Sequence, residues 1–213
     1  MKKLILVVII FVVITFFIMD SKKEEQNLPK EDPVSLEYED EKRAIFISYI
    51  ELEEYLNNKS VEESQSNIIQ MLNNIKDNGF NMILLHVRAF SDAIYPSEIY
   101  PYSSYISSIE GKDPEYDILQ FFIEETHKRN MELHAWVNPY RIRSTTDISS
   151  ISTDNPAYQY LNTNHVKVIE DVGIFYNPAS EEVRDLVISG IEELVKNYDI
   201  DGVHFDDYFY PDD

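Results

Sequence analysis

The sequence contains no cysteine, and this absence excludes disulfide bonds, thiolate zinc sites and attachment of a lipid to cysteine. Basic residues are also few, because 18 Lys and Arg stand against 39 Asp and Glu and leave a formal net charge of -21. Nucleic acids and anionic membrane surfaces are bound by clustered Lys and Arg, so the charge argues against both as partners. A sugar polymer has no such requirement and remains open as a partner.

Aromatic residues are abundant in the chain. They make up 13% of its 213 residues, and 15 of them are tyrosines, a composition that fits a binding cleft. Apolar residues account for 44% of the chain, which is enough for the core of one domain of ordinary size with additional segments.

The N-terminus has the pattern of an export signal. Lys2 and Lys3 precede sixteen residues without a charge, Leu4 to Met19. A hydrophobic helix of that length spans roughly 24 Å, which is short of the ~30 Å hydrocarbon core of a bilayer. No small-residue cleavage motif follows, so residues 1–19 fit an uncleaved signal anchor slightly better than a cleaved signal peptide. In both cases we expect the remainder to be exported, held at the extracellular face of the cytoplasmic membrane or secreted.

Residues 20–42 differ in composition from the rest of the chain. They are charged, contain proline and include few apolar side chains. Such a segment cannot bury enough apolar surface to fold, so we expect a disordered tether that leads into a folded part at 43–213.

Short apolar runs alternate with helical patterns in residues 43–213. Buried strands that alternate with helices pair in parallel through right-handed crossovers, and here the long loops follow the strands. We therefore expect an α/β fold of the (β/α)8 TIM-barrel type, truncated to about its first four βα units. A doubly wound open sheet is the alternative, although no glycine-rich phosphate loop follows the first strand. The predicted strands are 44–50, 81–88, 131–137 and 200–205, and the predicted helices are 60–79, 117–129 and 180–197.

Two long stretches follow strands, at 89–116 and 138–178. Within the second, Ser144 to Asn164 is rich in Ser, Thr and Asn. This composition suits either a lid over a cleft or a mobile loop, and we favour the mobile loop.

Side chains in a strand alternate between the two faces of a sheet, so residues two apart share a face. Three neighbouring strands thereby each place a histidine on one face, followed by a larger polar or aromatic side chain. Barrel interiors are ordinarily filled by Val, Ile and Leu, so three histidines in register indicate a site. The predicted groups are His86 with Arg88, His134 with Trp136 and Asn138, and His204 with Asp206 and Tyr208.

Two chemistries fit this arrangement. In the first, Asp206 is a catalytic carboxylate of a glycosidase, and the second carboxylate is Asp207, Asp92 or a group beyond residue 213. Asp207 points to the opposite face while the strand stays extended, so Asp92 is the better-placed of the two. In the second, weaker chemistry His86, His134, His204 and Asp206 hold a metal ion, as in barrel hydrolases. A solvated acidic turn is the non-functional interpretation of Asp206 and Asp207.

Five motifs of the chain resemble the glycosyl hydrolase-like 10 family of bacterial envelope proteins, which have a catalytic-type TIM barrel. The resemblance implies an exported glycosidase acting on a polysaccharide such as cell-wall (peptidoglycan) glycan strands. The leading hypothesis of carboxylate catalysis requires no metal or cofactor. The motifs are FISY (46–49), HVRAFSDAIYPS (86–97), YDIL (116–119), HAWVNPYR (134–141) and DGVHFDDYFYP (201–211).

The same resemblance assigns roles to individual residues. Asp206 and Asp207 would carry the catalytic and sugar-binding carboxylates. The resemblance places Arg88, Asp92, His134, Trp136, Asn138, Tyr140 and Arg141 along the cleft, and the position of Asp92 after a strand also makes it a catalytic candidate. With the side chains of the strand pattern added, the residues expected to bind substrate are Arg88, His86, His134, Trp136, Asn138, Tyr140, Arg141, His204 and Tyr208.

The family barrel continues beyond the length of this chain. We therefore expect a fragment of a longer barrel, and a homodimer that closes an eight-stranded barrel is the structural alternative. A non-catalytic carbohydrate-binding or decayed half-barrel module is the functional alternative.

Overall fold

The computed structural model describes residues 41–209. The predicted signal at 1–19, almost all of the predicted tether and the last four residues lie outside the described residues. Among residues 41–209, no helix is both long enough and apolar enough to cross a membrane.

A four-stranded parallel sheet forms the centre of the described part. Its strands are β1 (Ala44–Ile47), β2 (Met82–Arg88), β3 (Glu132–Val137) and β7 (Gly202–Phe205). They lie in the order β1-β2-β3-β7, so each strand is added beside the previous one without a reversal of direction. This is the strand order of a TIM barrel, and the prediction of a partial barrel is confirmed. The doubly wound alternative is wrong, because such a sheet reverses its order at a switch point.

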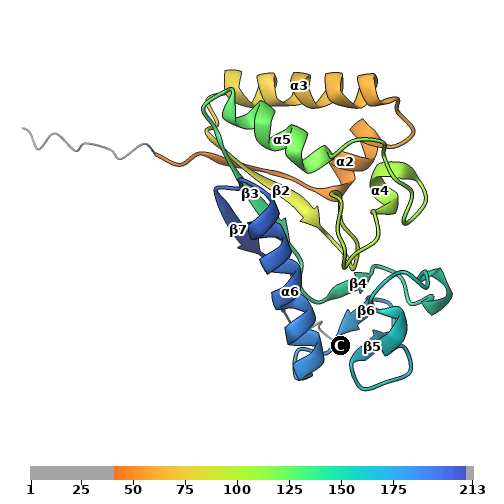
Figure 1. The fold of residues 1–213 in the computed structure, drawn as a ribbon. Coiled ribbons are helices and arrows are strands. Elements are labelled where there is room, and N and C mark those ends of the chain that lie inside the picture. Colours follow the sequence, from red (N-terminus) through yellow and green to blue (C-terminus); the bar gives the residue numbers. More distant parts are fainter. Residues whose placement is uncertain (1–40, 210–213) are drawn as a thin grey trace, which may run out of the picture. The chain divides into compact units, whose positions relative to one another are not determined.

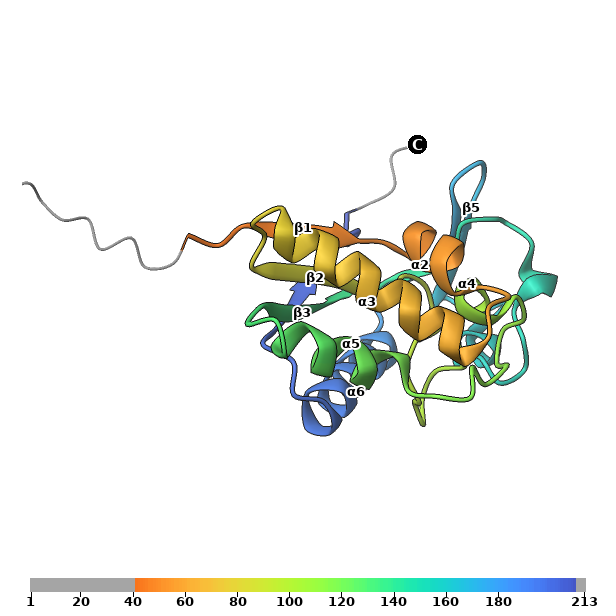
Figure 2. The same ribbon diagram turned by 90° about the horizontal axis from the view of Figure 1, so that it is seen from above.

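Three long helices cover one face of this sheet (Figures 1 and 2). They are α3 (Val61–Asp77), α5 (Ile118–His127) and α6 (Glu181–Asn197), at the predicted positions. Side-chain caps define their starts, because each cap oxygen accepts a backbone N–H that has no partner inside the helix. The caps are Ser60 for α3, Asp117 for α5 and Ser180 for α6. Ser60 also forms a capping box with Glu63.

The face under the helices, called the outer face here, contains the main core. Leu85 of β2 and Leu133 of β3 have no exposed surface, and the helices contribute Leu72, Phe122 and Leu194 to the same cluster. The opposite, inner face is the side on which the predicted histidines lie.

The predicted first strand, 44–50, is too long at its C-terminal end. The strand ends at Ile47 because Ser48 caps a helix, α2 (Tyr49–Leu56), that the sequence analysis did not predict. The hydroxyl of Ser48 accepts a hydrogen bond from the backbone N–H of Ile50, and the side chain of Glu51 accepts the N–H of Ser48 at 2.8 Å. This capping box starts α2 within an otherwise strand-like run of apolar residues.

The stretch 138–178 contains a small antiparallel sheet that the sequence analysis did not predict. Ser144 to Asn164 connects two of its strands, and the interpretation of this segment as a mobile loop stays a prediction. An antiparallel sheet forms in the order β4 (Arg141–Arg143), β6 (Gly173–Tyr176) and β5 (Val166–Ile169). Two short 3-10 turns, Ile148–Ser150 and Tyr158–Tyr160, lie between β4 and β5. A second apolar cluster anchors the segment, and it includes Ile142, Ile151, Ala157, Ile174, Tyr176 and Val183.

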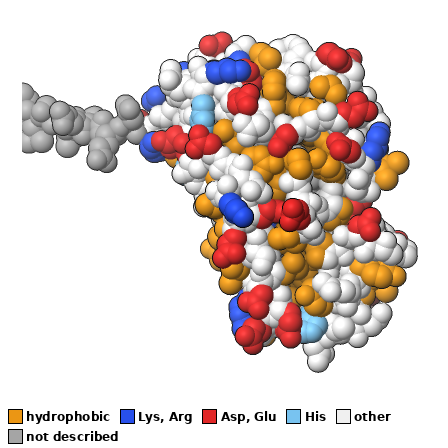
Figure 3. All heavy atoms as spheres, in the orientation of Figure 1, with side chains coloured by type: hydrophobic (Ala, Val, Ile, Leu, Met, Phe, Trp, Pro, Cys, Tyr) orange, Lys and Arg blue, Asp and Glu red, His pale blue; other side chains and the backbone are white. Residues whose placement is uncertain are grey.

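The loop after β2 contains one short helix, α4 (Ser104–Ser107), which packs beside α2. On the face of the molecule visible in Figure 3, acidic side chains are scattered and the Lys and Arg side chains stand apart from one another.

Candidate functional site

The inner face carries a row of aromatic rings across three strands. The strand register places Trp136 directly beside His86 on one side and His204 on the other, so the predicted shared face of these three residues is confirmed. The rings of His86 and Trp136 are stacked, with centroids 3.7 Å apart and planes 7° apart. Phe46 of β1 approaches Trp136 edge-on at 5.1 Å and His204 at 5.6 Å. Contacts between strands that are not neighbours show that the inner face is concave.

His134 stands two residues before Trp136 in β3, on the same face, and pairs with Gly202 of β7. Its ring occupies the space above Gly202, where a Cβ atom would come within 2.6 Å of Nδ1 of His134. Glycine at position 202 therefore admits the imidazole to the floor of the inner face. The predicted common face of His134 and Trp136 is confirmed.

His86 is the buried imidazole of the row and is uncharged near neutral pH. Burial lowers the pKa of His86 to about 3; the nearby amide of Asn138 opposes this shift, and the positive charge of Arg141 lowers the pKa further. Within residues 41–209, both ring nitrogens of His86 and Nε1 of Trp136 have no hydrogen-bond partner. Buried polar atoms are ordinarily satisfied, so these nitrogens favour a site that is completed by the hydroxyl groups of a ligand.

Arg88 does not share the face of His86, and this part of the sequence prediction is wrong. The register shifts between the two residues, so His86 pairs with Trp136 whereas Arg88 pairs with Val137. A bulge of this kind turns the following side chain to the other face. The buried guanidinium of Arg88 lies on the outer face under α6, 4.1 Å from the ring centre of Tyr100. A Cβ atom at Gly190 of α6 would approach its Nη1 to 2.1 Å.

Asn138 follows β3 and is held firmly at its end. Its backbone N–H donates to the carbonyl of Arg88 at 2.8 Å, and its Nδ2 donates to the carbonyl of Ala89 at 3.1 Å. Its Oδ1 is buried and has no partner among the described residues. Because Asn138 also acts on the pKa of His86, it extends the polar side of the inner face as predicted.

The acidic pair, Asp206 and Asp207, lies directly after the end of β7. The backbone N–H of Asp206 donates to Val137 at 3.2 Å, which continues the strand pairing by one residue. Asp207 then adopts a left-handed conformation with φ of 51°, and its N–H donates to Oδ1 of Asp206 at 2.8 Å. Nη1 of Arg141 donates to Oδ2 of Asp207 at 2.6 Å. Asp207 is thus an ion-pair partner of Arg141, whereas the carboxylate of Asp206 accepts only from the adjacent backbone in the described part.

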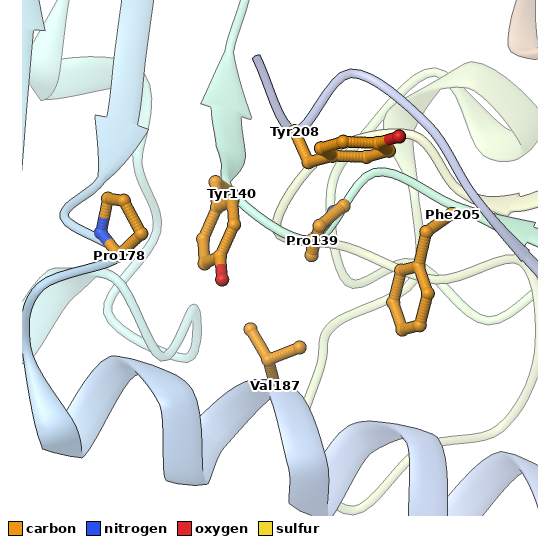
Figure 4. Close-up of a pocket in the computed structure, with 6 residues that line it drawn as sticks. All are labelled: Pro139, Tyr140, Pro178, Val187, Phe205 and Tyr208. Atoms are coloured by element: carbon orange, nitrogen blue, oxygen red, sulfur yellow. The ribbon is translucent and has the colours of Figure 1, made fainter. Parts of the chain in front are cut away.

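Tyr208 does not continue the face of His204 and Asp206, so its predicted placement is wrong. The left-handed residue before it breaks the alternation of side chains. Tyr208 is 55% exposed and lines an apolar pocket of about 640 Å³ together with Tyr140 and Phe205. Figure 4 shows the three rings with Pro139, and Val187 of α6 pointing toward them. Phe205 alternates with His204, so this pocket opens on the outer side, and Tyr140 lies there as well.

Asp92 lines a separate pocket of about 300 Å³, called the Asp92 pocket here. Its side chain is only 3% exposed, and burial raises its pKa to about 6 against the opposing effects of Arg143 and a hydrogen bond to Ser103. Tyr49 connects this pocket to the aromatic row. Its ring lies 5.8 Å from His86, 5.2 Å from Phe90 and 4.7 Å from Tyr105, measured between ring centres.

Several residues of this region were not predicted from the sequence. Tyr49 and Phe90 stand inside quoted motifs, but their ring contacts join segments that are far apart in the chain. A buried network attaches the antiparallel sheet to the loop after β2: Nδ2 of Asn155 donates to the carbonyl of Ser91 at 2.7 Å and to Glu110 at 2.7 Å. The hydroxyls of Ser91 and Tyr176 are 2.7 Å apart.

The metal-binding alternative has no assembled ligand set in the described part of the chain. No group of three or more His, Asp or Glu side chains between residues 41 and 209 is placed to hold a metal ion. His86, His134, His204 and Asp206 therefore do not converge on one point there.

The chain is similar to known proteins over this region. Residues 41–213 match the family model described as Glycosyl hydrolase-like 10. The chain is 46% identical over 155 residues to the glycosyl hydrolase YngK of Bacillus subtilis (strain 168), covering 71% of this chain and 29% of that protein. It is 36% identical over 154 residues to the glycosyl hydrolase DigH of Escherichia coli (strain K12), covering 68% of this chain and 35% of DigH.

Among solved structures, the fold resembles that of alpha-L-fucosidase isoenzyme 2 from Paenibacillus thiaminolyticus. The TM-score is 0.53 at 17% sequence identity, with 77% of this chain and 23% of the fucosidase covered, which is a likeness of fold alone. The chain thus spans about a third of the curated relatives that it matches. The match over residues 41–213 and the two relatives show that the chain belongs to the glycosyl hydrolase-like 10 family.

Proposed function

We propose that this chain carries part of the active site of a glycoside hydrolase, and that Asp206 is its principal carboxylate. The observation that carries the proposal is the position of Asp206 at the carboxyl end of β7, beside an inner face of aromatic rings. Catalytic residues of TIM barrels lie at this end of the strands. Family membership supports glycosidase-type chemistry at the same place.

The three candidate carboxyl groups have different surroundings, which suggests different roles. Asp207 is fixed by Arg141, so it suits orientation of a bound sugar. Asp92 is buried, its pKa is raised to about 6, and a carboxyl that keeps its proton up to that pH suits a proton donor. Asp206 is held through its backbone and bears no ion pair in the described part, so it is the carboxylate best placed to act on substrate.

The proposed substrate is a polysaccharide, with cell-wall glycan strands as the specific candidate. The export signal predicted at residues 1–19 would bring the chain to the compartment in which such glycans lie. The aromatic row suits sugar rings, because stacking on apolar ring faces does not require a charged ligand.

The test is replacement of Asp206 by Asn in the whole chain. We expect the release of reducing ends from purified peptidoglycan to fall by roughly a hundredfold or more, the scale of losing a catalytic acid or base. Asp185 is exposed on α6, so Asp185→Asn makes the same chemical change outside the site and is the matched control. Undiminished release by the Asp206→Asn variant would contradict the proposal. Saturable glycan binding without any product from the wild-type chain would instead support the carbohydrate-binding alternative.

A further inference from the structure

The Asp92 pocket lies outside the aromatic row and has its own walls. Phe90 and Tyr105 form one side, with their rings stacked at 5.5 Å between centres and 16° between planes. The volume of about 300 Å³ is at the lower end of the range for small-ligand sites. The pocket is therefore large enough for a single ring-sized group.

The charged side chains of the pocket are one ion pair and one further carboxyl group. Arg143 forms an ion pair with Glu110, and both line the pocket. The third ionisable group, Asp92, is buried and holds its proton to higher pH than an exposed carboxyl does. Below about pH 6 these three groups therefore carry no net charge, and above it the ionised Asp92 disfavours an anionic ligand while it can accept hydrogen bonds from hydroxyl groups. Both conditions are compatible with an uncharged ligand.

The remaining lining is suited to a polyol. Ser104, Thr145 and Ser150 add hydroxyl groups to the aromatic side formed by Phe90 and Tyr105. Aromatic faces with a few hydrogen-bonding groups match the two sides of a sugar ring, whose C–H bonds stack and whose hydroxyls donate and accept.

The pocket is also adjacent to the candidate catalytic carboxylates. Arg141, which binds Asp207, places its guanidinium carbon 5.9 Å from the ring centre of Phe90. Phe90 therefore separates the Asp92 pocket from the Arg141–Asp207 pair. A glycan chain that lies at Asp206 and Asp207 would reach the pocket across this ring.

We propose that the Asp92 pocket is a sugar subsite that binds one uncharged pyranose ring of the glycan, next to the ring at the Asp206–Asp207 pair. The identity of the ligand as a glycan rests on the function proposed above. The hydrogen bonds that join Ser91, Asn155 and Glu110 hold the pocket walls together, so the subsite is formed before the ligand binds.

Two adjacent threonines allow a matched test. Thr145 lines the pocket and Thr146 does not, and both are exposed, so a tryptophan at either position leaves the core intact. The probe is the β-1,4-linked tetramer of N-acetylglucosamine, and its dissociation constant is measured by calorimetry in the Asp206→Asn background to prevent cleavage. We expect Thr145→Trp to weaken binding about tenfold, equivalent to ~1.4 kcal/mol, and Thr146→Trp to change it less than about twofold.

The outcomes separate this inference from the proposed function. Equal affinities of the two tryptophan variants, or no binding of the tetramer by any variant, would overturn the subsite. Weaker binding by Thr145→Trp alone would support it, even if the wild-type chain released no product from peptidoglycan. Weaker binding by Thr145→Trp together with no product from the wild-type chain would contradict the proposed hydrolase but would still support the subsite.

Discussion

The two faces of the parallel sheet use the same strands in opposite ways. On the outer face, Leu85, Leu133 and Ala135 have no exposed surface and pack under the three long helices. On the inner face, Phe46 is 51% exposed, and Trp136 is only partly buried. The outer face supplies the apolar burial that drives folding, whereas the inner face keeps aromatic and polar groups available. Within each strand, the outer-face residues therefore contribute to stability, and the alternating inner-face residues are available for binding.

A single strand shows how sharply the faces are divided. His86 and Arg88 stand two residues apart in β2, yet the bulge between them sends their side chains to opposite faces. His86 stacks on Trp136 in the aromatic row, and Arg88 packs on Tyr100 under α6. One extra residue in the pairing is therefore enough to move a cation out of the candidate site and into the core.

Truncation of one residue on each face measures this division directly. Leu133→Ala removes a fully buried outer-face side chain, and we expect it to lower the free energy of unfolding by about 2–5 kcal/mol. Phe46→Ala on the half-exposed inner position should lower it by less than about 1 kcal/mol, since much of that ring already contacts water. Urea unfolding followed by circular dichroism gives both values.

Equal losses of unfolding free energy from the two truncations would contradict this division of roles between the faces. They would mean that the inner face is covered in solution and contributes to stability as the outer face does. A larger loss of unfolding free energy in Leu133→Ala, together with weaker glycan binding by Phe46→Ala, would support the division.

Much of the fold could be predicted because local signals agree with the final structure. Ser60 and Ser180 are followed by helical patterns, and the four strands follow apolar runs. Helix α2 escaped prediction because Tyr49 and Ile50 continue a β-like run, and only the Ser48 cap stops it. The antiparallel sheet escaped because its strands have three or four residues each, too few to show a period.

The candidate site was predictable only where the backbone stays regular. Period-two alternation placed His86, Trp136 and His204 together. It failed for Arg88 at the bulge and for Tyr208 after the left-handed Asp207, because neither irregularity has a distinct sequence signal. The Asp92 pocket depends on contacts between distant segments, such as Ser91 with Asn155, which a single sequence does not reveal.

The buried imidazole of His86 makes the inner face sensitive to acid. Its pKa falls from 6.5 to about 3 on folding, so the unfolded chain binds a proton more readily between those values. The stability contribution is present above about pH 6.5 and is lost as the pH falls toward 3. We expect this group to reduce the free energy of unfolding by about 2 kcal/mol between pH 7 and pH 5. The variant His86→Gln should lack that part of the pH dependence in urea titrations at both pH values, and an unchanged dependence would contradict the buried, neutral state of His86.

Asp92, at the edge of the inner face, should respond to pH in the opposite direction and by a smaller amount. Its pKa rises from 3.8 to about 6 on folding, because burial disfavours the charged carboxylate. The folded chain therefore binds the proton more tightly, and this contribution is full below about pH 3.8 and is lost as the pH rises through 6. Between pH 5 and pH 7 we expect the wild type to lose about 1 kcal/mol relative to Asp92→Asn, which cannot ionise. Asp185→Asn, on the exposed side of α6, should keep the wild-type dependence in the same urea titrations. If Asp92→Asn and the wild type changed in parallel, Asp92 would not titrate between pH 5 and pH 7 on folding, and its raised pKa would be contradicted.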